Sequence, residues 1–443
     1  MVSELKDLLN IQKTYLKSDL NLNTEEYTYF TNPITEEAIH PHIAQSLYKK
    51  LVKGVVNSNK GNLLQRKKIS IQRRFFALQV LNQLGFVGSF IPMAERLITD
   101  CELYSFHAEA SQISRLLFRH FTTRVVDLEL AKSYYEKSKY HGKIYQSEIE
   151  FDWKFSLVKS KYDTDDFFNE TENINQILIE LNNKQHNNST RLKYIYLELS
   201  YYKAYILGDQ DQIESICREA IEYFKSLPYE HYLGVNVFTF HLLELYQRRG
   251  EFAKTELLVN STLRSISPSV PSLFRYEEFL TRSYLYQGNS KKTAARLRDL
   301  NSSISSFDNA KFKGRLHLYE LYQAILTNEI ADLSQIHKDM RQFHQQVEYT
   351  TPLLIGKVVY FLLSNDRSNA LLTMVHLTNY SELYLSGKHA KTISFIAFLQ
   401  SLLERGTPHS KVHFFSTNKR YVSPIEIIRY DLLQELLLGK LTF

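Results

Sequence analysis

The stretch Leu243-Glu244-Leu245-Tyr246-Gln247-Arg248-Arg249-Gly250-Glu251-Phe252-Ala253 joins two amphipathic segments through a short polar break. On both sides of the break, apolar residues recur at three- and four-residue spacing, which is the period of an α-helix. Gly250 can adopt the left-handed backbone conformation that ends a helix. The stretch therefore predicts a helix–turn–helix corner.

Breaks of this kind recur along the second half of the chain. Each contains a glycine, an asparagine or an aspartate: Gly208, Gly250, Gly288, Asn328, Asp366 and Gly406. Their intervals are 42, 38, 40, 38 and 40 residues, and Pro228, Pro268 and, more loosely, Pro352 form a second series between them. Aspartate enters the left-handed region less readily than glycine or asparagine, so Asp366 is the weakest member. Two series in one register predict an array of helix pairs.

The register also predicts which side chains enter the core. The residues four positions before each break are apolar or aromatic: Ala204, Tyr246, Tyr284, Ala324, Leu362 and Leu402. Nine positions after each break, five of six residues are hydrophobic: Cys217, Val259, Leu297, His337, Val375 and Phe415. Both sets are expected to be buried between helices.

The stretch from Leu243 to Ala253 resembles the Leu…Tyr…Gly-x-Tyr/Phe run of the tetratricopeptide-repeat superfamily. The resemblance covers roughly residues 190–430, and more weakly 100–190. It implies an all-α fold, an α-solenoid of stacked helix–turn–helix repeats, here with about 40 residues per repeat against the family's roughly 34. The chain departs from the family where a small residue is expected five positions after each break: Ile213, Thr255, Thr293, Leu333, Leu371 and Lys411. No ligand-binding residue is therefore carried over from the family.

The composition agrees with this fold class. Hydrophobic residues make up 44% of the 443, enough for a sizeable core, whereas only 14 glycines and 9 prolines occur. That scarcity argues against sandwiches, propellers and nucleotide-binding α/β folds, which need many turns. We expect an N-terminal helical segment with a basic stretch over residues 1–75, followed by the helical-repeat array over residues 76–443, clearest in 190–430.

The expected compartment is the cytoplasm. The N-terminal MVSELKDLLNIQKTYL is charged and lacks the apolar core of a signal peptide. No run approaches the ~18 apolar residues of a membrane span. Cys101 and Cys217 are far apart and have no metal-ligand spacing, so both are expected as reduced thiols.

The strongest signal beyond the architecture is a charge asymmetry. From Ala38 to Ala94 no Asp or Glu occurs, and nine bases do: Lys49, Lys50, Lys53, Lys60, Arg66, Lys67, Lys68, Arg73 and Arg74. The formal net charge is +6, so the rest of the chain sums to −3. Such a stretch attracts phosphate, anionic lipid or an acidic protein face. Two other outcomes stay open, a solvated face and pairing with an acidic stretch within or between copies: Glu148, Glu150, Asp152, Asp163, Asp165, Asp166, Glu170 and Glu172.

No motif predicts catalysis, a cofactor or a metal site. The pairs His40/His42 and His337/His344 lack further ligands at a useful spacing. Gly288-Asn289-Ser290-Lys291-Lys292-Thr293 has neither the spacing nor the preceding strand of a phosphate-binding loop, and is better explained as a corner before a helix. An active site assembled from distant helices would leave no such motif.

The sequence favours a non-enzymatic protein- or peptide-binding scaffold that uses the groove of a helical array. The expected groove residues are tyrosines of the first helices: Tyr201, Tyr202, Tyr205, Tyr246, Tyr284, Tyr319 and Tyr322. The alternative is a regulatory or nucleic-acid-associated protein that contacts phosphate through the basic segment 49–74 while the repeats sense a ligand or peptide. An enzyme is the third hypothesis, and self-association into a homo-oligomer is compatible with each.

Overall fold

The computed structural model describes residues 63–84, 87–162, 167, 169–183, 189–229, 231–265, 270–305, 310–329, 331, 346–385, 389–405 and 425–441. Regular structure within these ranges is helical, and no strand occurs in them, which confirms the all-α prediction. None of the helices in these ranges combines the length and the apolar character that crossing a membrane requires.

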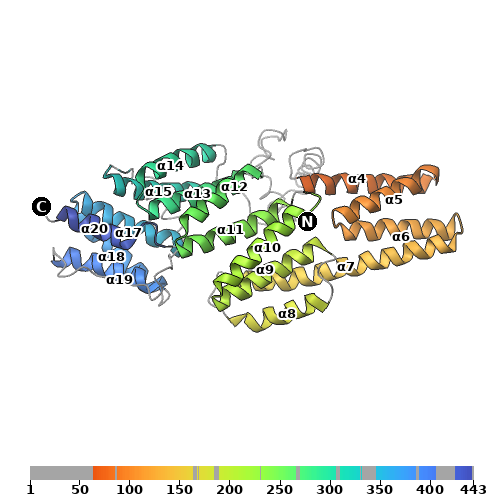
Figure 1. The fold of residues 1–443 in the computed structure, drawn as a ribbon, viewed down its shortest axis with the longest axis horizontal. Coiled ribbons are helices and arrows are strands. Elements are labelled where there is room, and N and C mark those ends of the chain that lie inside the picture. Colours follow the sequence, from red (N-terminus) through yellow and green to blue (C-terminus); the bar gives the residue numbers. More distant parts are fainter. Residues whose placement is uncertain are drawn as a thin grey trace, which may run out of the picture. The chain divides into compact units, whose positions relative to one another are not determined.

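The chain forms two compact units, Met1–Phe238 and Thr239–Phe443, and the division falls inside one helix. The first unit and the dividing helix contain α4 (Leu63–Leu84), α5 (Val87–Leu103), α6 (His107–Thr123), α7 (Leu128–Ser160), α8 (Thr171–Asn183), α9 (Thr190–Leu207), α10 (Gln210–Ser226) and α11 (Tyr232–Arg249). The second contains α12 (Phe252–Ser265), α13 (Val270–Tyr286), α14 (Ser290–Ser305), α15 (Ala310–Thr327), α17 (Val347–Leu363), α18 (Arg367–Tyr384), α19 (Ala390–Arg405) and α20 (Tyr430–Leu441). In both units, helices that follow one another in sequence mostly pack side by side (Figure 1).

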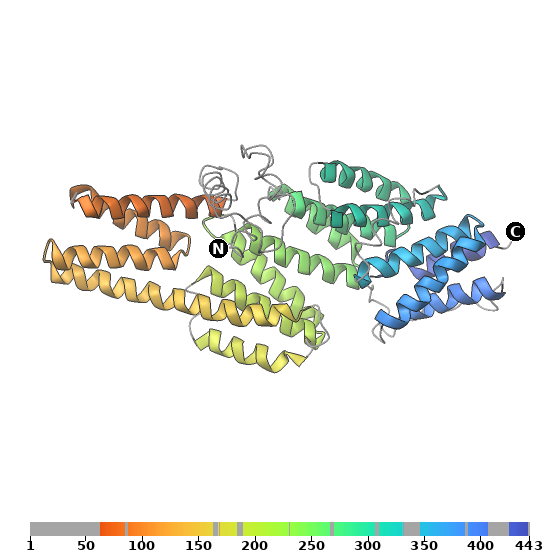
Figure 2. The same cartoon turned by 180° about the vertical axis from the view of Figure 1, so that it is seen from behind.

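The first unit holds two groups of helices that share α7. Helices α4, α5 and α6 and the start of α7 enclose an apolar core that includes Phe90, Leu97 and Leu117. Helix α7 is 33 residues long and runs past the beginning of α6, so that its second half packs with α8 and α9 (Figure 2). Asp127 caps its first turn by accepting a hydrogen bond from the Leu130 N–H at 3.0 Å.

The largest apolar cluster lies in the second unit and extends from α13 to α20. Near its C-terminal end the ring of Tyr430 stacks on Phe395, with centroids 4.3 Å apart. The buried Glu426 carboxylate accepts from the Lys391 ammonium at 2.7 Å and from the Tyr430 N–H at 2.9 Å. These contacts hold the start of α20 against α19.

The corner prediction is confirmed at four positions. Gly208, Gly250, Gly288 and Asn328 all have a positive φ, between 57° and 70°. After each of them the next N–H bonds to the carbonyl five residues earlier, as in Asp209 to Ala204 at 3.0 Å. This bond satisfies a carbonyl that the end of the helix would leave without a partner. The predicted corner in Gly288–Thr293 is correct as well, since Asn289 accepts from the Lys292 N–H and starts α14.

At Asp366 the prediction is wrong by one residue. Asn365 takes the left-handed conformation, with φ of 60°, because asparagine tolerates that region better than aspartate. Asp366 instead caps α18 and accepts from the Asn369 N–H at 3.1 Å. The shift explains why Val375, expected in the core, is exposed, whereas its neighbour Met374 is buried.

Of the other predictions from the sequence, some are confirmed, one is wrong and some fall outside the described residues. Ala204, Tyr246, Tyr284, Ala324 and Leu402 are buried, as are Cys217, Val259 and Leu297, and both cysteines are free thiols. Pro352 lies inside α17 and does not mark a joint. Gly406, His337, Phe415 and the first 62 residues lie outside the described ranges. The division into 1–75 and 76–443 stays a prediction, and residue 75 falls within α4.

Replacing Gly208 by alanine isolates the conformational requirement of a corner. A Cβ there meets no atom within 4 Å, so the only penalty is the left-handed backbone, which costs an L-residue roughly 1 kcal/mol. We expect Gly208→Ala to lower the free energy of unfolding by about that amount, measured by urea denaturation. The control is Gly439→Ala, which is equally open but lies within α20, where alanine is the better helix former. Equal effects of the two substitutions on the free energy of unfolding would contradict the conclusion that the corner at position 208 requires a left-handed residue.

Candidate functional site

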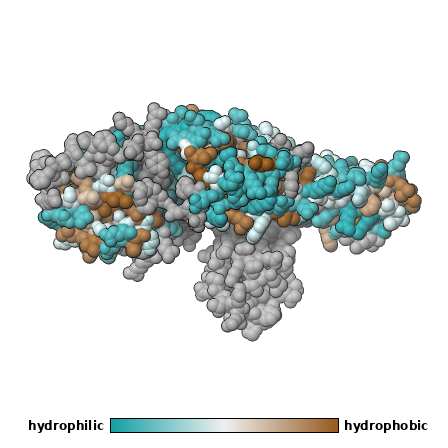
Figure 3. All heavy atoms as spheres, turned by 90° about the horizontal axis from the view of Figure 1, so that it is seen from below, coloured by the Kyte–Doolittle hydropathy of each residue, from teal (hydrophilic) through white to brown (hydrophobic). Residues whose placement is uncertain are grey.

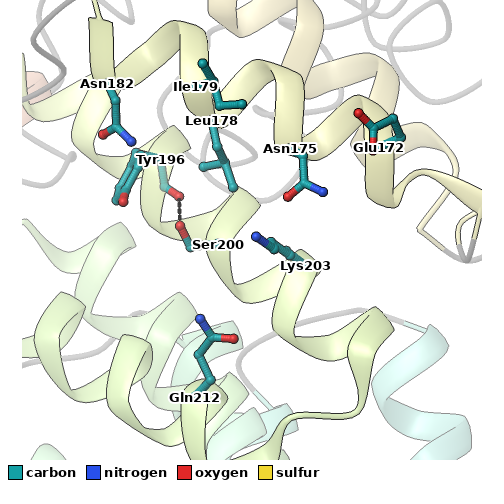
Figure 4. A pocket seen from close by; sticks show the side chains of 9 residues that line it. All are labelled: Glu172, Asn175, Leu178, Ile179, Asn182, Tyr196, Ser200, Lys203 and Gln212. Carbon is teal, nitrogen blue, oxygen red and sulfur yellow. Dashed lines mark hydrogen bonds between the residues drawn. The ribbon is translucent and has the colours of Figure 1, made fainter.

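A pocket of about 450 Å³ opens between α8, α9 and α10 of the first unit. Helix α9 supplies its floor with Tyr196, Ser200 and Lys203, and α10 contributes Gln212. The wall on α8 consists of residues at three- and four-residue steps along one helix face: Glu172, Asn175, Leu178, Ile179 and Asn182. Figure 4 shows these side chains directed from three helices toward one space.

Five polar side chains of this pocket have no side-chain partner among the described residues. Among the residues that the structure describes, none hydrogen-bonds to the side-chain amides of Asn175, Asn182 or Gln212. No described carboxylate lies within ion-pair distance of the Lys203 ammonium, and none of the described cations pairs with Glu172. By contrast, the Ser200 hydroxyl donates to the Tyr196 carbonyl at 2.8 Å within α9. The pocket therefore presents amide donors and acceptors, one cation and one anion beside the exposed apolar Ile179.

This lining suits an extended peptide better than a small apolar molecule. An asparagine side chain offers a carbonyl and an NH₂ group, the same donor and acceptor pair as a peptide bond. Asn175 and Asn182 are seven residues apart, two turns along α8, and so repeat that pair along the wall. Leu178 and Ile179 lie between them and can contact an apolar side chain of the ligand.

The tyrosines expected to line a groove are mostly core residues. Six of the seven are buried, and only Tyr205 is partly exposed. Tyr319 donates to the buried Glu278 carboxylate at 2.6 Å, and Tyr322 donates to the Pro352 carbonyl at 2.7 Å. The expectation of exposed rings is wrong for these six, because burying a ring between packed helices stabilises the fold more than leaving it in a groove.

The basic segment is described only in part, since Lys49, Lys50 and Lys53 precede the described ranges. Arg66, Lys67, Lys68 and Arg73 are exposed on α4, which carries no acid within its bounds. Arg74 pairs with Asp100 at 2.7 Å. The ammonium groups of Lys67 and Lys68 lie 5.8 Å from the ring centroids of Tyr104 and Phe106.

The acidic stretch pairs mainly with other cations. Asp152 binds Arg191, Glu150 binds Lys154 and Glu170 binds Lys161. Glu148 interacts with the basic helix: burial raises the pKa of its carboxyl, and the charge of Lys68 on α4 partly offsets that rise. Asp163, Asp165 and Asp166 lie outside the described ranges. Pairing within the described chain thus leaves the basic face of α4 largely open.

Three buried histidines lie where α5, α6 and α7 meet. The Nδ1 atoms of His107 and His141 are 3.0 Å apart, and His141 Nε2 is 3.1 Å from the Glu102 carboxylate. A neutral His141 can donate a hydrogen bond to Glu102 from Nε2–H, and its unprotonated Nδ1 then accepts a hydrogen bond from the Nδ1–H of His107. His120 packs between Phe90 and Phe121, and neither of its ring nitrogens has a hydrogen-bond partner among the described residues. His40, His42, His337 and His344 lie outside the described ranges, within which no group of three or more metal-binding side chains is suitably placed.

One buried thiol is unsuited to nucleophilic chemistry. Burial, followed by the nearby carboxylates of Glu109 and Asp100, raises the pKa of Cys101 to about 12. The thiol therefore stays protonated near neutral pH, and the thiolate is the reactive form.

The histidines predict how stability depends on pH. Burial lowers the pKa of both His120 and His141 from the ordinary value of 6.5, so the folded chain binds fewer protons than the unfolded chain. The contribution of these two histidines to the free energy of unfolding should therefore be complete above pH 6.5 and be lost as the pH drops below it. His120→Phe should reduce this pH dependence, measured by urea denaturation at pH 7.5 and 5.5. The control His376→Phe, at an exposed position on α18, should retain it, and a His120→Phe variant with unchanged pH dependence would contradict the assignment.

Comparison of the sequence with protein-family models, with curated proteins and with solved structures gave no match. The assignment of a function therefore rests on the residues that the structure brings together. The sequence patterns did not identify Asn175, Asn182 and Lys203 as site residues. Their only signal was two asparagines two turns apart on a helix, which is common on solvated helix faces.

Proposed function

We propose that the chain is a non-enzymatic scaffold that binds an extended peptide or protein segment in the pocket between α8, α9 and α10. The observation that carries this proposal is the row of amide side chains without described partners, beside Lys203 and the exposed Ile179. An extended peptide exposes one amide donor and one acceptor per residue, which such a row can satisfy. The peptide's side chains would then select among ligands through Lys203, Glu172 and Ile179.

We further infer that the scaffold is an array of tetratricopeptide-like repeats of about 40 residues that works in the cytoplasm. The recurring left-handed corners support this architecture, since those at Gly208, Gly250, Gly288, Asn328 and Asn365 close with the same backbone bond. The corrected register adds support at Asn365. Five residues after it stands the buried Ala370, a small residue of the kind that the family places there.

Peptide binding in the pocket can be tested with peptides that are selected for binding to the wild-type protein. A displayed library of random peptides of about twelve residues is selected on the wild type, and a recovered peptide is labelled for fluorescence anisotropy. Asn175→Ala, Asn182→Ala and Lys203→Ala should each weaken binding about tenfold, a loss typical of a central contact. Lys225→Ala, on the exposed surface of α10 outside the pocket, is the matched control and should bind as the wild type does. Selection of no peptide, or equal binding by all variants, would refute the proposal.

The alternative function is binding of nucleic acid through α4. It is favoured by the exposure of four basic side chains on a helix without acids. Four phosphate contacts would make binding of a short DNA duplex about a hundredfold weaker between roughly 50 and 200 mM salt.

The test of this alternative reverses the charges of Arg66, Lys67, Lys68 and Arg73 to glutamate. The quadruple variant should lose binding of the duplex and its salt dependence, whereas Lys225→Glu should retain both. Binding by the wild type that does not respond to salt would exclude phosphate contacts. Peptide binding in the pocket should be unaffected by the α4 variant, so the two functions are separable.

A further inference from the structure

One end of the pocket between α8, α9 and α10 is polar. Figure 4 shows Asn175 of α8 and Lys203 of α9 at this end, with Asn182 and Tyr196 at the other. Asn175 and Lys203 are half-buried, whereas Glu172, which supplies the anion of the lining, is exposed. The deeper charge of the pocket is therefore positive.

Lys203 differs from the other two cations of its helix. Arg191 of α9 pairs with Asp152, and Lys193 pairs with Glu219 at 3.0 Å. By contrast, no described carboxylate lies within ion-pair distance of Lys203. A half-buried ammonium loses part of its hydration, and no anion among the described residues compensates for that loss. A bound carboxylate would compensate for it.

Two amide side chains add hydrogen-bond donors to this cation. The amides of Asn175 and Gln212 have no hydrogen-bond partner among the described residues. Each offers an NH₂ group with two donors, and the Lys203 ammonium offers three. An ionised carboxylate only accepts hydrogen bonds, and its bonds to a cation are shorter and stronger than those between neutral groups. The combination therefore suits a carboxylate better than an uncharged group.

The acids on the neighbouring helices do not supply that carboxylate. Glu180 of α8 binds Lys154, and Glu214 of α10 binds Arg218. Glu172 is exposed and lies outside ion-pair distance of Lys203. Within the part of the chain that the structure describes, the anion that fits Lys203 thus has to come from a ligand.

We propose that the peptide bound in this pocket presents a carboxylate, which the Lys203 ammonium holds together with the amides of Asn175 and Gln212. This inference rests on the proposed peptide-binding function and names the chemical class of the ligand. The carboxylate belongs either to an Asp or Glu side chain or to the free C-terminus of the peptide, because both present the same two acceptor oxygens.

Charge reversal at Lys203 tests the class of ligand. A library of random twelve-residue peptides with free C-termini is selected in parallel on the wild type, on Lys203→Glu and on Lys225→Glu, which makes the same charge change on the exposed surface of α10. The wild type and Lys225→Glu should recover peptides with an Asp or Glu at one shared position or a required free C-terminus. Lys203→Glu should lose that preference and select Lys or Arg instead. Circular dichroism serves as the folding control.

Fluorescence anisotropy with a recovered peptide distinguishes the two sources of the carboxylate. Replacing the shared Asp or Glu by Asn or Gln should weaken binding to the wild type about tenfold where a side chain is bound, and amidating the C-terminus should do so where the terminus is bound. Lys203→Gln, which keeps a polar side chain without the charge, should bind the charged and neutral peptides equally. Glu172→Gln should strengthen binding of the charged peptide, since it removes a like charge from the pocket.

Two results would overturn the proposal and still leave the pocket a peptide-binding site. In the first, the wild type selects peptides without any preference for a carboxylate. In the second, the tenfold loss caused by neutralising the peptide persists in Lys203→Gln, which would mean that another group holds the charge. Selection of no peptide by the wild type would instead remove the proposed function, and this inference with it.

Discussion

The described helices of residues 190–385 depend on one backbone arrangement, the left-handed corner closed by a hydrogen bond to the carbonyl five residues earlier. A helix ends with four carbonyls that lack partners, and a chain that must reverse within two or three residues has few ways to satisfy them. One residue with positive φ directs the next N–H back to the helix it has just left. The bond recurs from Asp209 to Ala204, Glu251 to Tyr246, Asn289 to Tyr284, Glu329 to Ala324 and Asp366 to Phe361. Because each corner turns the chain in the same way, consecutive helices come to lie against each other.

The abundant tyrosines have a structural role that follows from this arrangement. A wide seam between helices needs large side chains, and a buried tyrosine also needs a partner for its hydroxyl. Tyr319 finds the Glu278 carboxylate, which Arg315 also contacts at 2.9 Å, and Tyr430 lies 3.1 Å from the Thr392 hydroxyl. Burial in these seams raises the pKa of both phenols. The face seen in Figure 3 shows separate apolar areas among hydrophilic ones.

Helix α7 connects the two groups of helices in the first unit. Its first half is packed by α6, and its second half supports α9, which forms the floor of the amide-lined pocket. The same second half leaves the side chains of Ile149 and Trp153 exposed.

The sequence by itself determined the helical class and most corners, because these depend on local backbone preferences: glycine or asparagine had to occupy the left-handed positions, and apolar residues kept a fixed distance from them. It misplaced one corner by a single residue, since Asn365 and Asp366 are both polar residues common in turns and only the folded backbone shows which has positive φ. Tertiary structure decided which apolar residues are buried. Tyr201 and Trp153 both lie in helices, yet one is enclosed by neighbouring rings and the other is open. It also gathered Asn175, Lys203 and Gln212 from three helices, an arrangement that arises from helix packing and leaves no mark at fixed sequence spacing.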